Sequence, residues 1–325
     1  MNRRKKAFLY TILFVLFLCL VGPFLIPTPG DDQAIAQRDL ADSGSRFVNV
    51  LGYDLHYREM GAGGRTLILM HGFGGNLYTW RKAMEPLAEY GRVIAFDRVG
   101  AGLSAHPIAG DWQGQSPYAP SMQPEFLVAV MNELEVEQAV LVGHSQGGAI
   151  ALSTTLLYPE RVTALVLVDP AIYTSGGPPA ELAWLWRTPP MRRIGPWVAQ
   201  RFLGEASVER LIALAWHDPS RFTAEERQKT RKYLDVKNRA AALWEYTAAS
   251  EANNLPERLG EVDLPVLVIA GDNDRIVPTT EHIRLSQEIR SAQLVIIEEC
   301  GHLPQEEQPE EFLRAVRGFL GSISE

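Results

Sequence analysis

A serine at the end of a predicted buried strand is the residue of this 325-residue chain best placed for covalent chemistry. Ser145 stands within Gly-His-Ser-Gln-Gly over residues 143–147, after the apolar run 139–142 and before the small and apolar run 147–157. A strand that turns at once into a helix strains the residue at the turn and exposes its side chain above the helix N-terminus. Free N–H groups at that terminus favour negative charge, so the turn suits a nucleophile.

Ser145 can act as a nucleophile only if a base takes its proton and a third group orients that base. His302 and Asp274 each come just after a predicted strand late in the chain. The carboxyl ends of parallel strands meet at one edge of a sheet, so we expect both side chains beside Ser145. In that arrangement His302 would be the general base and Asp274 would fix its tautomer. Asp169 also follows a strand and is the alternative acid, although we prefer Asp274.

An attacked carbonyl develops negative charge on its oxygen, and backbone N–H groups can stabilise that charge. The glycine-rich segment 71–76 follows a predicted strand, so its backbone can come close to the sheet edge. We predict that the N–H groups of Phe73 and Gln146 form this oxyanion hole. Gly72 and His144, which flank these positions, are candidates to line the substrate pocket.

Other reactive groups near these residues fit structural roles better. His71 and His144 are expected to pack around the site, and Cys300 is expected to be a buried thiol. The sequence has no spacing typical of metal ligands and no phosphate-binding loop followed by Lys and Ser or Thr. We therefore expect neither a metal nor a cofactor.

The order of predicted strands and helices indicates how these residues come together. Residues 46–60 predict an antiparallel hairpin, and strands then alternate with helices through residue 170 and again over residues 251–325. Such alternation is typical of an α/β protein with a mostly parallel central sheet and helices on both faces. The later predicted strands are 66–70, 92–96, 139–142, 164–168, 264–270 and 293–297, and the predicted helices are 76–90, 123–134, 147–157, 279–289 and 306–320.

Residues 171–250 interrupt this alternation, contain no predicted strand and hold five of the seven tryptophans. We interpret them as a helical lid inserted between two parts of the core, residues 46–170 and 251–325. An aromatic lid above a reactive serine indicates an apolar substrate pocket. Trp184 and Trp186 are the lid residues that we expect in that pocket.

The N-terminus predicts a membrane segment. Residues 1–6 form a basic tail, and residues 7–26 are a run of twenty uncharged, mostly apolar residues. As a helix this run spans about 30 Å, the thickness of a bilayer core. We expect a transmembrane signal anchor with a cytoplasmic N-terminus, a linker over residues 27–45 and the catalytic part outside the cytoplasm. The alternative is a signal peptide cleaved after Ala34-Ile35-Ala36, which would release a secreted protein.

Composition excludes some other functions. The net charge of −8 and the lack of a basic stripe argue against a nucleic-acid partner. The chain has only two cysteines, Cys19 in the apolar run and Cys300 in the core, which are not expected to pair. No disulfide framework is therefore predicted.

Five motifs follow one another in the order typical of one superfamily. They are His71-Gly72-Phe73-Gly74-Gly75, Asp97-Arg98-Val99-Gly100-Ala101-Gly102-Leu103-Ser104, Gly143-His144-Ser145-Gln146-Gly147-Gly148, Gly271-Asp272-Asn273-Asp274-Arg275-Ile276-Val277-Pro278 and Gly301-His302-Leu303-Pro304. With them the chain resembles the α/β-hydrolase superfamily, in its lid-bearing branch, from residue 46 to the end except for the lid. The resemblance implies that fold and the chain order serine, acid, histidine, which Ser145, Asp274 and His302 meet.

The resemblance also implies an activity. It indicates a serine hydrolase that cleaves apolar carboxylic esters, such as lipids or acylglycerols, through an acyl-enzyme. With its membrane segment the chain looks similar to membrane-bound monoacylglycerol lipases and some bacterial lipases. Haloalkane dehalogenases and epoxide hydrolases are disfavoured because they carry Asp where this chain has Ser145. Two alternatives stay open: a hydrolase of carbon–carbon bonds in vinylogous diketones, and a ligand-binding protein of this fold without turnover.

Overall fold

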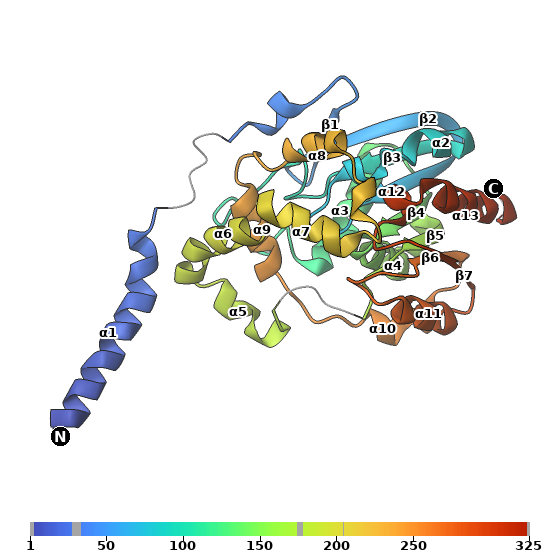
Figure 1. Ribbon diagram of the computed structural model, residues 1–325. Coiled ribbons are helices and arrows are strands. Elements are labelled where there is room, and N and C mark those ends of the chain that lie inside the picture. Colours follow the sequence, from blue (N-terminus) through green and yellow to red (C-terminus); the bar gives the residue numbers. More distant parts are fainter. Residues whose placement is uncertain (1–2, 28–33, 174–177, 204, 324–325) are drawn as a thin grey trace.

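One twisted sheet forms the centre of the molecule (Figure 1). The computed structural model describes residues 3–27, 34–173, 178–203 and 205–323. The sheet has seven strands. Six of them follow the order β1-β2-β4-β5-β6-β7, and the seventh, β3, pairs with β2. Strand β1 is antiparallel to β2, and every other pair of neighbouring strands is parallel. The strands are β1 Arg46–Val50, β2 Tyr53–Met70, β3 Gly91–Phe96, β4 Ala139–His144, β5 Val162–Val168, β6 Val266–Gly271 and β7 Ala292–Ile297.

Strand β2 is a single long strand where the sequence predicts two. Its two halves flank β3, because Val93 pairs with both Met60 and Leu67. The glycines between the halves, at residues 61, 63 and 64, have positive φ, which lets the chain bend there without a clash from a Cβ. The carboxyl ends of β2 and β3 therefore lie side by side at the edge of the sheet where β4 also ends.

Helices cover both faces of the sheet, which confirms the predicted fold class (Figure 1). Alternate residues of β2 belong to separate cores: Ile68 and Met70 pack on one face, and Leu67 and Leu69 on the other. The first core contains α3 Gln123–Glu133, α4 Gln146–Leu157 and α11 Thr279–Glu288, and the second contains α2 Met84–Leu87 and α13 Pro309–Ser322.

Two predicted helices are interrupted in the structure. The helix expected over residues 76–90 is instead a 3-10 turn at Leu77–Trp80, the short α2 and a second 3-10 turn at Ala88–Tyr90. The helix expected over residues 306–320 is divided into α12 Pro304–Glu307 and α13. Gln308, with φ −128°, separates them because a residue before proline avoids the helical conformation.

The segment between β5 and β6 is helical where the structure describes it. Its helices are α5 Ala183–Trp186, α6 Pro189–Leu203, α7 Glu205–Ala215, α8 Ala224–Arg231, α9 Arg239–Ala248 and α10 Leu255–Arg258. Helices α6 and α9 pack closely, since a Cβ on Gly195 would lie 1.9 Å from the ring of Trp244. We call α5 to α9 the helical insertion.

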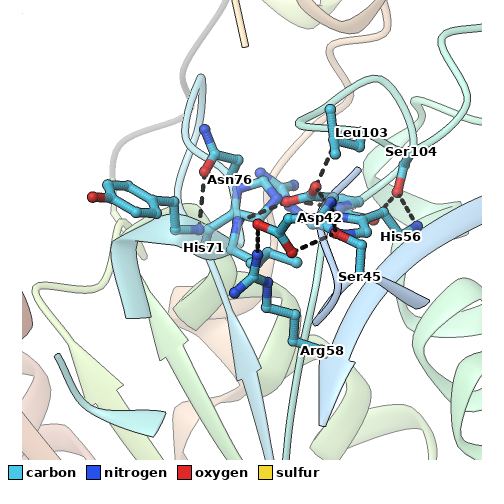
Figure 2. A network of polar contacts seen from close by, with 12 residues as sticks. Asp42, Ser45, His56, Arg58, His71, Asn76, Leu103 and Ser104 are labelled. Atoms are coloured by element: carbon cyan, nitrogen blue, oxygen red, sulfur yellow. Dashed lines mark hydrogen bonds and ion pairs between the residues drawn. The ribbon is translucent and has the colours of Figure 1, made fainter. Parts of the chain in front are cut away.

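The N-terminal helix α1, Arg3–Leu25, extends away from the rest of the molecule (Figure 1). It has the length and apolar composition needed to cross a membrane. The residues after it are not an open linker where they are described. Ile35 bridges to Val236, and Asp42 accepts a hydrogen bond from Arg58, which ties this segment to β2 (Figure 2).

A cluster of ion pairs ties the helical insertion to the core. Glu226 on α8 contacts Arg81 at 2.5 Å, and Arg81 also contacts Glu306 on α12 at 2.6 Å. Burial alone would raise the pKa of Glu226, but Arg81 and the Thr223 backbone N–H lower this pKa from 4.5 to about 2. The pair therefore contributes its full stability above pH 4.5 and loses it as the pH falls toward 2.

We expect Glu226→Gln to lower the free energy of unfolding at neutral pH by about 1–2 kcal/mol and to flatten its dependence on pH in the acid range. Urea unfolding followed by circular dichroism measures both effects. Glu225→Gln is the matched control, because Glu225 forms only an exposed pair with Lys229 on the same helix. Equal losses in the two variants would contradict the role given to Arg81.

Candidate active site

The backbone of Ser145 is held in a strained conformation at the end of β4. Its φ of 53° and ψ of −117° lie outside the regions that residues with a Cβ usually adopt. The Ser145 N–H donates to Val168 O at 2.8 Å, and Ser145 O accepts from the N–H groups of Gly148 and Ala171 at 3.0 and 3.1 Å. Strand β5 and helix α4 thus fix the turn from both sides.

The glycines on either side of Ser145 are required by close contacts. A Cβ on Gly143 would lie 2.4 Å from Gly147 O, and a Cβ on Gly147 would lie 2.4 Å from Met70 O. Larger residues would push α4 away from the sheet. The Gly-x-Ser-x-Gly pattern therefore reflects the close approach of α4 to β2 and β4.

His302 and Asp274 are brought together by the loops after β7 and β6. His302 Nδ1 donates to Asp274 Oδ2 at 2.6 Å, which leaves Nε2 free to accept a proton. Asp274 Oδ1 accepts from the N–H groups of Ile276 and Val277 at 2.7 and 3.0 Å. Burial alone would raise the pKa of Asp274, but the imidazoles of His282 and His302 and these N–H groups hold it well below its usual value.

The backbone of His302 is fixed as firmly as its side chain. His302 N–H donates to Ala215 O in α7 at 2.6 Å, and His144 Nε2 donates to His302 O at 2.7 Å. Burial and the neighbouring His302 lower the pKa of His144 to about 3, so His144 is neutral. The sequence predicted that His144 packs near the site and lines the pocket, and His144 also links the Ser145 turn to His302.

Asp169, the alternative acid, lies behind Asp274 instead of contacting His302. Its Oδ1 accepts from the Gly271 N–H at 3.0 Å. The buried His282 Nε2 lies 3.3 Å from Asp169 and 3.5 Å from Asp274. Burial and the charge of Asp274 raise the pKa of Asp169 well above its usual value, which favours the neutral form of this carboxyl.

The peptide between Gly72 and Phe73 is locked by the residues behind it. The Arg98 backbone N–H donates to His71 Nε2 at 3.2 Å, so the proton of this imidazole is on Nδ1 and donates to Gly72 O at 2.8 Å. Arg98 Nη2 also donates to Gly72 O, at 3.1 Å. In a trans peptide the carbonyl and the next N–H point in opposite directions, so the Phe73 N–H faces away from these donors.

The N–H groups of Phe73 and Gln146 are available for a ligand. Within the part of the chain that the structure describes, neither donates to a protein acceptor. Gly72 lies directly against the serine, since a Cβ on it would be 2.9 Å from Ser145 Cβ. Two free N–H groups beside a buried hydroxyl are the arrangement that stabilises an oxyanion.

Arg98 is a buried cation that the sequence analysis did not single out. It is 5% exposed, and among the described residues it contacts no carboxylate. Its guanidinium donates to Gly72 O, to Gln146 Oε1 at 3.2 Å and to the Tyr246 hydroxyl of α9 at 2.9 Å. Its position directly after Asp97, at the end of β3, was the available signal.

Asp97 anchors the turn from which Arg98 projects. Its carboxylate contacts His56 Nδ1 at 2.7 Å and accepts from the N–H groups of Leu77 and Leu103 at 2.6 and 2.8 Å. A Cβ on Gly102 would lie 1.9 Å from this carboxylate. The motif over residues 97–104 therefore holds Arg98 in place.

A cavity of about 380 Å³ lies between the sheet edge and the helical insertion. Ser145, His302, Gly72 and His144 line it, as predicted for the last two. Its insertion side is formed by Val208, Leu211, Ile212, Ala215, Trp216, Leu243 and Tyr246, among others.

The prediction that Trp184 and Trp186 line this cavity is wrong. Trp184 is 64% exposed, and Trp186 packs against Trp244 with ring centroids 5.2 Å apart. Trp216, which packs on Phe222, is the tryptophan that lines the cavity. Sequence alone could not show which of the tryptophans faces inward, because the insertion helices follow no repeating order.

Two further groups near the site do not suit reactive roles. Asp169, Asp274 and His302 offer possible ligand atoms within 4.8 Å of one another, but Asp274 already accepts the His302 proton. Burial raises the pKa of the Cys300 thiol, which makes it a poor nucleophile.

Comparisons with known proteins agree on the class of protein. The profile of the alpha/beta hydrolase fold matches residues 65–309. The 2-hydroxy-6-oxononadienedioate/2-hydroxy-6-oxononatrienedioate hydrolase of Cupriavidus pinatubonensis is 31% identical, over 89% of this chain and 100% of that protein. The enzyme of the same name from Paraburkholderia phymatum is 33% identical, over 85% and 96%. The structure of a meta-cleavage product hydrolase from Pseudomonas fluorescens IP01 superposes with a TM-score of 0.66 and 25% identity, over 85% and 97%.

The two buried carboxyls are expected to respond differently to replacement. Asp274→Asn should lower kcat by about 10⁴-fold, because the amide cannot hold His302 in the required tautomer. Asp169→Asn should change kcat by less than about threefold, since Asp274 and not Asp169 is hydrogen-bonded to His302, and Asn is isosteric with Asp. Steady-state kinetics on one substrate, with thermal unfolding as a control for folding, test the pair. A loss in Asp169→Asn as large as that in Asp274→Asn would make Asp169 the partner acid.

Arg98→Met should lower kcat by about 10- to 100-fold while KM changes little, because it releases the Gly72–Phe73 peptide beside the oxyanion. Tyr246→Phe is the matched control, since it removes one Arg98 contact but leaves Gly72 O bonded. Its kcat should stay within about threefold of the native value. Equal kcat in Arg98→Met and the native protein would show that the other donors to Gly72 O, His71 and the Gly75 N–H, suffice.

Proposed function

Because this chain belongs to the α/β-hydrolase fold family, we propose that it hydrolyses a carbon–carbon bond of acidic, vinylogous diketones by nucleophilic attack of Ser145. The observation that carries this proposal is the extent of the alignment with relatives named for such substrates. The alignment covers nearly the whole length of those enzymes, and so includes the helical insertion, which forms one side of the cavity.

The charge of the cavity supports an acidic substrate. Arg98, which forms no ion pair with a carboxylate among the described residues, is one of the lining residues. Glu306 is the one carboxylate among its described lining residues, and Arg81 neutralises it at 2.6 Å. A buried guanidinium without a carboxylate partner favours a ligand that brings negative charge.

The proposed reaction uses the site geometry in two stages. His302 Nε2 takes the Ser145 proton as Oγ attacks the ketone, and the Phe73 and Gln146 N–H groups stabilise the oxyanion. Collapse breaks the carbon–carbon bond, and its electron pair passes to the conjugated fragment, which takes up the proton held by His302. Water, deprotonated by His302, then hydrolyses the acyl-enzyme to a carboxylic acid and free Ser145.

Ester hydrolysis is the second candidate, and the apolar lining favours it. Val208, Leu211, Ile212, Trp216 and Leu243 would suit an acyl chain. The same nucleophile, base and oxyanion hole would serve, with an alcohol as the leaving group. An apolar ester or lipid is the substrate in this case.

The proposal also includes the membrane topology and the domain limits of the chain. Helix α1 would be a retained anchor with residues 1–6 in the cytoplasm, and the catalytic part would lie on the other side of the membrane. Residues 171–250 would act as a lid on a core of residues 46–170 and 251–325. The transmembrane segment would be residues 7–26, and residues 27–45 would link it to the core. The proposed reaction uses no cofactor.

The full chain in detergent should cleave a 2-hydroxy-6-oxodienoate with a kcat/KM roughly tenfold or more above that for the best member of an ester series of increasing chain length. Ser145→Ala should abolish turnover of both while retaining the thermal unfolding transition. Loss of the dienoate absorbance and titration of released acid measure the two reactions.

Either of two results would contradict the proposal. A higher kcat/KM on esters would assign ester hydrolysis, and the optimal chain length would then separate a lipase from a short-chain esterase. Ligand binding without turnover by the folded native chain, unchanged in Ser145→Ala, would identify a binding protein.

A further inference from the structure

Helices α5 and α6 present large apolar side chains to the surface. We call this the α5–α6 face and define it by Leu182, Trp184, Leu185, Trp197 and Val198, which are 36 to 64% exposed. Single exposed apolar residues are common, but several on two adjacent helices, two of them tryptophans, mark an interaction surface. We propose that the α5–α6 face docks on the anionic phospholipid bilayer that α1 enters.

The attachment of α1 places this face at the bilayer surface. Arg193 Nη2 and Nε donate to Ile26 O at 2.9 and 3.2 Å, and Trp197 Nε1 donates to Pro27 O at 2.9 Å. Ile26 and Pro27 directly follow α1, whose length of 23 residues corresponds to about 35 Å. When α1 crosses a bilayer, its last residues reach the headgroup region, and Arg193 and Trp197 are held at the same depth.

The side-chain chemistry of the face suits headgroups. Trp184 and Trp197 combine an apolar ring with one N–H donor, and such residues are enriched where bilayer meets water. Arg187 lies directly after α5 and Arg193 lies on α6, whereas Glu181 precedes α5. An excess of guanidinium groups near the surface adds about 1 kcal/mol each in binding to anionic lipid.

A bilayer fits this face better than a second copy of the chain. The face is continuous with α1, and any surface beside the end of an inserted helix must meet lipid headgroups before it meets another protein. Figure 1 shows α5 and α6 at the end of the molecule from which α1 leaves. Helix α7, which follows α6, lines the cavity through Val208, Leu211 and Ile212. Docking would therefore bring the wall of the cavity close to molecules dissolved in the bilayer.

The test uses the full chain reconstituted in vesicles of phosphatidylcholine and phosphatidylglycerol. In a Cys19→Ser background, Trp184→Cys carries an environment-sensitive dye; Cys300 is fully buried and stays unlabelled. Glu310→Cys on α13, at the opposite end of the molecule, is the matched control (Figure 1). Bromolipids should quench the dye at residue 184 roughly twofold more than the dye at residue 310, and less in vesicles without phosphatidylglycerol.

Three results would overturn the inference. Equal, water-like emission at residues 184 and 310 would show that the face is solvated. A blue-shifted dye that bromolipids do not quench, with a shift that grows with protein density, would identify a second copy as the occupant. Failure of the full chain to float with vesicles would show that α1 is no anchor. None of these results depends on whether the chain cleaves diketones or esters.

Discussion

The contact of helix α4 with the sheet is the constraint on which the site depends. Gly143 and Gly147 allow backbone atoms of β4, α4 and β2 to meet without a Cβ between them. This approach forces Ser145 to a φ of 53°, a conformation that costs of order 1–3 kcal/mol. A hydrogen bond from the Ser145 N–H to Val168 O and hydrogen bonds from the N–H groups of Gly148 and Ala171 to Ser145 O offset that cost and leave the hydroxyl at the cavity. The position of the proposed nucleophile is therefore a consequence of packing across three elements.

A second set of contacts determines the direction of one peptide. Gly72 O is bonded by His71 and Arg98, and Arg98 in turn contacts Gln146 and Tyr246. One buried guanidinium thus connects both N–H groups proposed for the oxyanion to a helix of the insertion. A movement of α9 would therefore shift the Gly72–Phe73 peptide through these hydrogen bonds. Arg98 therefore connects the helical insertion to the proposed oxyanion site by hydrogen bonds.

Residue patterns predicted the parts of the structure that depend on local sequence and on parallel strand ends. The sheet, helices α3, α4 and α11 and the meeting of His302 with Asp274 follow from apolar runs and from turns placed after them. The orientation of Trp184 and Trp186 did not follow, because the insertion helices pack by side-chain shape without a repeating order. Arg98 was overlooked since an arginine in a glycine-rich turn usually reaches solvent, and its burial depends on Tyr246 far along the chain.

The fold distinguishes the two buried aspartates that the sequence offered as the acid beside His302. Asp169 and Asp274 both follow strands and both lie near His282, so a negative charge on one makes ionisation of the other less favourable. Asp274 receives two backbone N–H groups and the His302 imidazole, whereas Asp169 receives the Gly271 N–H. Negative charge is therefore better stabilised on Asp274, and its presence raises the pKa of Asp169. Because the better-stabilised carboxylate is the one bonded to Nδ1 of His302, the proton of this imidazole is held on Nδ1.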